Sequence, residues 1–236
     1  MNGSAWSPSP SVRARGDELQ RAIPNVQGSQ LESDDSARIQ LPVAPGTRLL
    51  AAWVKARWGL SSVGMARGAS IRRPARRADG ALRRRDVHEE GRAIDAMTAD
   101  VAKGTEIAEA LVFYAAELGI QYLIWRRTEW SSSAYATAWE PYTGTSDHAD
   151  HVHAEVTPAM AASESGMRAA LARVDALMAG RPAPPPVAPS PAAGRTPATP
   201  PAGAGVSIPY PRAADGSLLF GAGILGGLWW WFRGRK

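Results

Sequence analysis

The four histidines of this 236-residue chain all fall in two short stretches, residues 86–97 and 146–156. The first stretch reads DVHEEGRAIDAM and the second SDHADHVHAEV. Imidazole and carboxylate groups bind metals and transfer protons near neutral pH, so this clustering favours a metal or acid–base site over histidines scattered for packing. The chain contains no cysteine, which excludes disulfides, thiolate nucleophiles and cysteine-ligated metals. Any metal must therefore rely on histidine and carboxylate ligands.

Alternation in the second stretch predicts a strand over VHAEV, residues 152–156. On such a strand His151, His153 and Glu155 share one face, while the intervening apolar residues face the core. The two imidazoles then project side by side into one cleft.

The first stretch supplies the complementary groups. If GRAIDAM at 91–97 is also a strand, Asp95 points to one of its faces, and His88 precedes it across a turn that Gly91 permits. His88, Asp95 and one imidazole of the second stretch would make a tripod of two nitrogens and one oxygen. Three protein ligands and an open position are typical of catalytic zinc. Asp150 and Asp147 lie at the edge of the same strand as candidate general bases.

These residues carry a resemblance to a known family. HEEGRAID followed by DHVHAE resembles the M15 zinc peptidases, which include D-alanyl-D-alanine carboxypeptidases and phage L-alanyl-D-glutamate endopeptidases and share a zinc fold with lysostaphin-like enzymes and the hedgehog signalling domain. The resemblance covers about residues 45–160. The positions that match the family pattern are His88, Gly91, Ala93, Asp95, Asp150 and His153, with Glu155 where the phage endopeptidases often carry glutamate.

The resemblance implies roles for individual residues. His88, Asp95 and His153 would bind Zn²⁺, Asp150 would be the general base, and His151 would stabilise the oxyanion or support a ligand. Arg72 lies where family members often carry an arginine that holds a substrate carboxylate or the oxyanion.

The sequence departs from the family pattern in two places. Asp86 replaces the serine two positions before the first histidine, and the hedgehog-like spacing would select Asp147 instead of Asp150 as the acidic partner. A zinc site without a competent base would bind metal and catalyse nothing.

The surrounding pattern predicts an α+β fold, with a small antiparallel sheet flanked by helices, over residues 44–180. Apolar residues at helical spacing predict a helix that ends at Gly59 and another over 105–118, and IQYLIW at 120–125 predicts a strand. The polar composition of residues 1–43 predicts disorder. Tryptophans at 125, 130 and 139 are interpreted as packing residues or cleft walls, and no nucleic-acid motif accompanies them.

Two further segments follow the domain. Residues 181–216 are rich in proline and alanine and predict an extended spacer. Residues 217–232 are 16 uncharged positions followed by Arg233, Arg235 and Lys236, which predicts a short transmembrane anchor with interfacial tryptophans. The alternative is an apolar tail that docks on protein.

Together these patterns predict a zinc-dependent peptidase acting on peptidoglycan stem peptides, as a carboxypeptidase or an endopeptidase. The net charge of +5 favours anionic partners such as wall polymers. The domain would face the cell wall or periplasm from a membrane anchor, and because no apolar run near the N-terminus suits a secretory signal, delivery would use a phage lysis route or an injection machine. The alternative hypothesis is a membrane-tethered, zinc-stabilised binding module without catalysis. The sequence indicates no oligomeric state.

Overall fold

The structure, a computed structural model, describes residues 4–31, 41–65, 78, 80–134 and 137–181. The chain divides into two units, Met1–Ala193 and Gly194–Lys236, and every described residue belongs to the first. The expected linker beyond Arg181 and the expected anchor at 217–232 therefore lie outside the described residues. Within the described ranges, no helix combines the length and apolar character needed to cross a bilayer.

A six-stranded antiparallel sheet forms the centre of the described unit, in the order β1-β2-β6-β3-β4-β5. Its strands are β1 Val63–Gly64, β2 Ala93–Met97, β3 Ile120–Trp125, β4 Thr128–Ser131, β5 Trp139–Pro141 and β6 His151–Val156. The two strands that carry the chemistry-bearing residues, β2 and β6, are direct neighbours although about 60 residues separate them in the chain.

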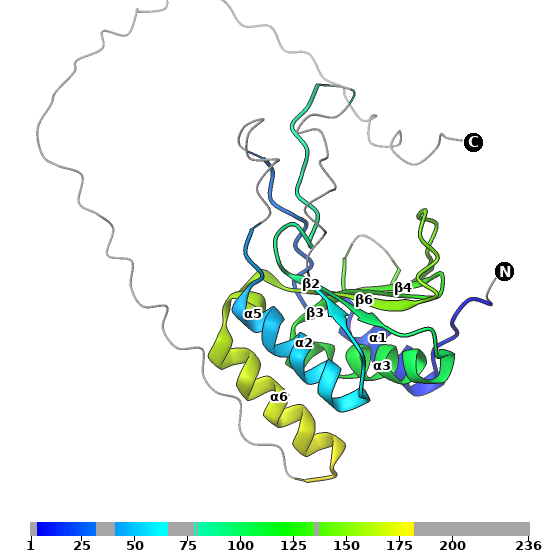
Figure 1. Ribbon diagram of the computed structural model, residues 1–236. Helices are drawn as coiled ribbons and strands as arrows, with labels where there is room; N and C mark the ends of the chain where they lie inside the picture. Colours follow the sequence, from blue (N-terminus) through cyan, green and yellow to red (C-terminus); the bar gives the residue numbers. More distant parts are fainter. Residues whose placement is uncertain (1–3, 32–40, 66–77, 79, 135–136, 182–236) are drawn as a thin grey trace, which may run out of the picture. The chain divides into compact units, whose positions relative to one another are not determined.

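The helices are α1 Pro10–Leu19, α2 Pro45–Trp58, α3 Val101–Phe113, α4 Ala115–Leu118, α5 Pro158–Ala162 and α6 Glu164–Met178. Figure 1 shows α1, α2, α3 and α6 gathered on one side of the sheet. The core lies between these helices and the sheet, with Leu50, Ile107 and Leu123 among its fully buried side chains. The predicted α+β class with an antiparallel sheet is confirmed for the described residues.

Most predicted elements occur close to their expected bounds, and their ends have local causes. Gly59 adopts a left-handed conformation with φ of 61° and ends α2 as expected. The helix predicted over 105–118 begins earlier, because Asp100 caps α3 by accepting a hydrogen bond from the Lys103 amide at 3.1 Å, and it breaks at Tyr114. Gly104 therefore lies inside α3, where an added Cβ would fall 2.3 Å from the Trp125 ring.

The N-terminal segment differs from the expectation of disorder over 1–43. Residues 4–31 include α1, and five of their apolar side chains are buried in the structure: Trp6, Val12, Leu19, Ile23 and Leu31. The Trp6 ring meets that of Trp139 edge-on at 5.5 Å. The segment is polar on average, but its few apolar side chains find burial against the rest of the unit, which offsets the entropy of ordering it.

Candidate metal centre

The register between β2 and β6 positions the first two chemistry-bearing residues. Asp95 pairs directly with His153 across the two strands. Their chain neighbours Ile94, Val152 and Ala154 are fully buried in the core, so Asp95 and His153 project from the opposite face of the sheet. The predicted strand alternation is confirmed at both positions.

His88 reaches the same place from the turn that precedes β2. The turn is braced reciprocally, because the Glu89 amide donates to the Asp86 carboxylate at 2.9 Å and the Asp86 amide donates to the Glu89 carboxylate at 3.0 Å. Asp86, which departs from the family serine, thus shapes this turn. Gly91 closes it with φ of 67°, and an added Cβ there would lie 2.5 Å from the Pro42 carbonyl oxygen.

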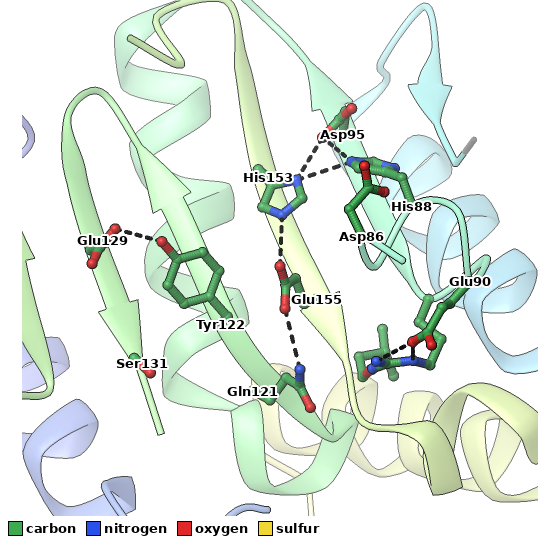
Figure 2. A network of polar contacts seen from close by, with 12 residues as sticks. Asp86, His88, Glu90, Asp95, Gln121, Tyr122, Glu129, Ser131, His153 and Glu155 are labelled. Carbon is green, nitrogen blue, oxygen red and sulfur yellow. Dashed lines mark hydrogen bonds and ion pairs between the residues drawn. The ribbon is translucent and has the colours of Figure 1, made fainter. Parts of the chain in front are cut away.

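Three ligand atoms converge at this point: Nε2 of His88, Oδ1 of Asp95 and Nδ1 of His153 (Figure 2). The two nitrogens lie 3.2 Å apart, and Oδ1 lies 3.2 Å from the first and 2.9 Å from the second. A tetrahedral ion bound at 2.0–2.1 Å places its ligand atoms about 3.3 Å apart, close to this triangle. His88, Asp95 and His153 could therefore hold a metal ion. The spacing in the sequence predicts His88 and Asp95 with one imidazole of the second stretch, and the family resemblance selects His153.

The electrostatics of the triangle favour positive charge. Burial raises the pKa of Asp95, but hydrogen bonds to His153 and His88 and the charges of these residues together lower it by more. The pKa of Asp95 therefore lies below its usual value. Burial lowers the pKa of His153, but hydrogen bonds to Asp95 and Glu155 and their charges raise it to about 9. In the absence of metal, a proton on His153 compensates the half-buried Asp95 carboxylate, and a cation can replace that proton.

His151 and Asp150 form a second pair beside the triangle. Nδ1 of His151 lies 2.7 Å from Oδ1 of Asp150, and Nε2 of His151 lies 3.8 Å from Oδ1 of Asp95. The Asp150 side chain is 71% exposed, whereas that of His151 is 18% exposed. The imidazole, and not the carboxylate, is thus the member of this pair that lies next to the ligand atoms.

The other proposed site residues lie in different surroundings. The Asp147 carboxylate accepts a hydrogen bond from the Ala149 amide at 3.1 Å, which orders the loop before β6. Arg72 lies outside the described residues.

Two features of the site were not predicted from the sequence. His148, the remaining histidine, is buried, and its ring centroid lies 4.7 Å from that of His151 and 5.9 Å from that of His153. Burial and the neighbouring imidazoles lower its pKa to about 4. In the sequence, the clustering of all four histidines in two short stretches is the signal that could have indicated that His148 belongs to the site.

The second unpredicted feature is a polar chain that leads away from His153. Oε1 of Glu155 lies 3.4 Å from Nε2 of His153, and Oε2 of Glu155 accepts a hydrogen bond from Gln121 at 3.2 Å (Figure 2). Next to Gln121 on β3, the Tyr122 hydroxyl donates a hydrogen bond to Glu129 on β4 at 2.5 Å. No spacing rule points to Gln121, because it stands within an apolar strand sequence.

Comparison with known protein families gives a match to part of the chain. The family model described as VldE, C-terminal domain, matches residues 43–153. The matched range includes α2 and all three members of the ligand triangle and ends at His153. No curated protein and no solved structure matches the chain.

Proposed function

We propose that this protein is a zinc-dependent peptidase that cleaves stem peptides of peptidoglycan. The observation that carries the proposal is the triangle of His88, Asp95 and His153. Its two nitrogens and one carboxylate oxygen are a donor set that zinc accepts in catalytic sites, where one position stays open for substrate or water.

The residues beside the triangle supply the proton transfer. When bound, zinc supplies Lewis acidity, because it lowers the pKa of water and polarises a carbonyl group. Nε2 of His151 is the proton acceptor in this proposal, because it lies 3.8 Å from the ligand oxygen of Asp95. Asp150 holds the imidazole through Nδ1 at 2.7 Å and stabilises its protonated form. The exposed Asp150 carboxylate acting directly as the base is the alternative assignment, and the two are distinguished by substitution below.

The substrate class rests on the resemblance of residues 86–97 and 146–156 to the M15 peptidases and on the positive charge of the chain. A net charge of +5 attracts anionic wall polymers. Arg72 is the proposed holder of a substrate carboxylate or of the oxyanion. Cleavage of a terminal residue or of an internal bond are both compatible with this site.

The proposal includes an anchored location. Residues 181–216 would act as a spacer, and its first 23 residues, 181–203, would reach about 70 Å as a polyproline helix. Residues 217–232, followed by three basic residues, would hold the protein in a membrane with the peptidase domain on the wall side. Delivery by a phage lysis route or an injection machine is part of this proposal.

The test measures the metal content of the purified full-length protein and of His88→Ala and His153→Ala. About one zinc per chain, lost in both variants, supports the site. The wild type is then incubated with purified stem peptides, and the products are identified by mass spectrometry. A metal-free wild type contradicts the proposal, and bound zinc without cleavage favours a zinc-stabilised binding module.

A further inference from the structure

A chain of polar contacts connects the ligand His153 to the N-terminal segment. From Nε2 of His153 it passes to Glu155 at 3.4 Å and then to Gln121 at 3.2 Å. Gln121 donates to the Val26 carbonyl oxygen at 3.0 Å and accepts from the Val26 amide at 3.1 Å. Asn25 adds a hydrogen bond to the Gln121 carbonyl oxygen at 3.0 Å. The proposed catalytic step uses none of these groups except His153.

The placement of Gln121 shows that this chain is built into the fold. Its side chain is fully buried, and an amide buried without partners costs several kcal/mol, so its position depends on these hydrogen bonds. The pairing of β3 with β6 shifts register between Ile120 and Tyr122. Such a bulge turns a side chain away from its regular direction, which brings Gln121 beside Glu155 although Ile120 and Leu123 both lie in the core.

The two histidine ligands differ in this respect. The buried Nδ1 of His88 has no hydrogen-bond partner among the described residues, so the braced turn orients that ring. His153 instead has a carboxylate on the nitrogen that faces away from the ligand triangle. A carboxylate in this position fixes the tautomer that leaves Nδ1 free to bind a metal, and it raises the basicity of the ligand.

We propose that Glu155 is a positioning residue for His153, and that Gln121 fixes Glu155 by tying it to residues 25–26. This inference rests on the proposed metal site. It assigns to the N-terminal segment a part in metal affinity, although that segment contributes no ligand. Partners of this kind contribute about 10- to 100-fold to metal affinity.

The experiment measures zinc affinity of the full-length protein by competition with a chromophoric chelator, and records the absorption spectrum of the cobalt(II)-loaded protein. Glu155→Ala is expected to bind zinc about 10- to 100-fold more weakly and to change the cobalt spectrum. Glu155→Gln keeps an acceptor oxygen and is expected to recover part of the loss. Gln121→Leu removes the tie to Val26 and is expected to weaken binding about tenfold.

Glu129→Gln is the matched control, because Glu129 lies on β4, two strands from Glu155 on β6, and bonds to Tyr122 instead of a ligand. It should change zinc affinity less than about twofold, a small effect beside that of Glu155→Ala. Thermal unfolding of each metal-free variant separates a loss of folding from a loss of positioning. A wild type that binds zinc together with Glu155→Ala of equal affinity and spectrum overturns this inference alone. A wild type that binds no zinc overturns the proposed function and this inference with it.

Discussion

His148 and His153 are both buried in the same cluster, with 7% and 8% of their surface exposed, yet their environments have opposite effects. The pKa of His153 rises to about 9 because Asp95 and Glu155 outweigh burial, whereas burial and two neighbouring imidazoles lower the pKa of His148 to about 4. Burial alone therefore does not set the charge of an imidazole. The carboxylates do, and they mark His153 as the position prepared for a cation.

The substitution with the largest expected effect on zinc binding removes the ligand His153. His153→Ala removes Nδ1 from the triangle and should abolish zinc binding, because two ligands remain. His148→Ala removes an imidazole outside the ligand triangle and should change zinc affinity less than about threefold, which is small beside the contribution of about 10- to 100-fold from a residue that positions a ligand. Metal content after gel filtration and chelator competition measure both. Equal losses in the two variants would contradict the distinction.

A second comparison separates the members of the Asp150–His151 pair, with metal content unchanged in both variants. His151→Ala should lower kcat about 10²- to 10⁴-fold, since it removes the proposed proton acceptor. Asp150→Asn keeps the imidazole but weakens its orientation and should cost less. Steady-state cleavage of a stem peptide provides the rates. The reverse order, with Asp150→Asn the more damaging change, would assign the base to Asp150 directly.

The third prediction concerns stability of the metal-free protein against pH. The raised pKa of His153 contributes stability that is complete below its unfolded value near 6.5 and is lost as pH rises through about 9. The lowered pKa of His148 acts in the opposite direction: its contribution is complete above 6.5 and is lost as pH falls through about 4. Each is worth about 3 kcal/mol over its range.

Urea unfolding at a series of pH values tests both directions. The alkaline decline should disappear in His153→Ala, and the acidic decline should shrink in His148→Ala. The lowered pKa of Asp95 belongs to the same ion pair as His153 and adds no separate contribution in the alkaline range. A profile that declines in the same pH range for both variants would show that the two histidines do not differ in charge.

The ligands were predictable from the sequence because both strands carry local signals. Alternation places His153 and Asp95 on one face of their own strands, and one antiparallel register then brings them together. The roles of His148 and Gln121 were not predictable. The position of His148 depends on its own backbone, held at φ of 49° in a loop. The position of Gln121 depends on a bulge between β3 and β6, which are distant in the chain.

The N-terminal segment illustrates the same limit. Averaged composition predicts disorder over 1–43, because polar residues dominate. Burial instead depends on what a few apolar side chains contact in three dimensions: the Trp6 ring packs against that of Trp139, far along the chain, and Leu19 is buried in the same core. Hydrogen bonds from this segment to Gln121 are equally long-range, so local sequence patterns could not reveal them.

The smallest expected effect tests how far the ligand triangle depends on backbone placement. Gly91→Ala should destabilise the protein by about 2 kcal/mol, because it adds strain at positive φ and a contact with the Pro42 carbonyl oxygen. Gly59→Ala is the control: it has similar φ of 61°, but an added Cβ there meets nothing within 4 Å, so about 1 kcal/mol of strain is expected. Chemical unfolding gives both values. Zinc affinity should fall only in Gly91→Ala, because that turn holds His88, whose Nδ1 has no hydrogen-bond partner among the described residues, whereas Nε2 of His153 faces Glu155. Unchanged affinity would show that the triangle tolerates movement of the turn.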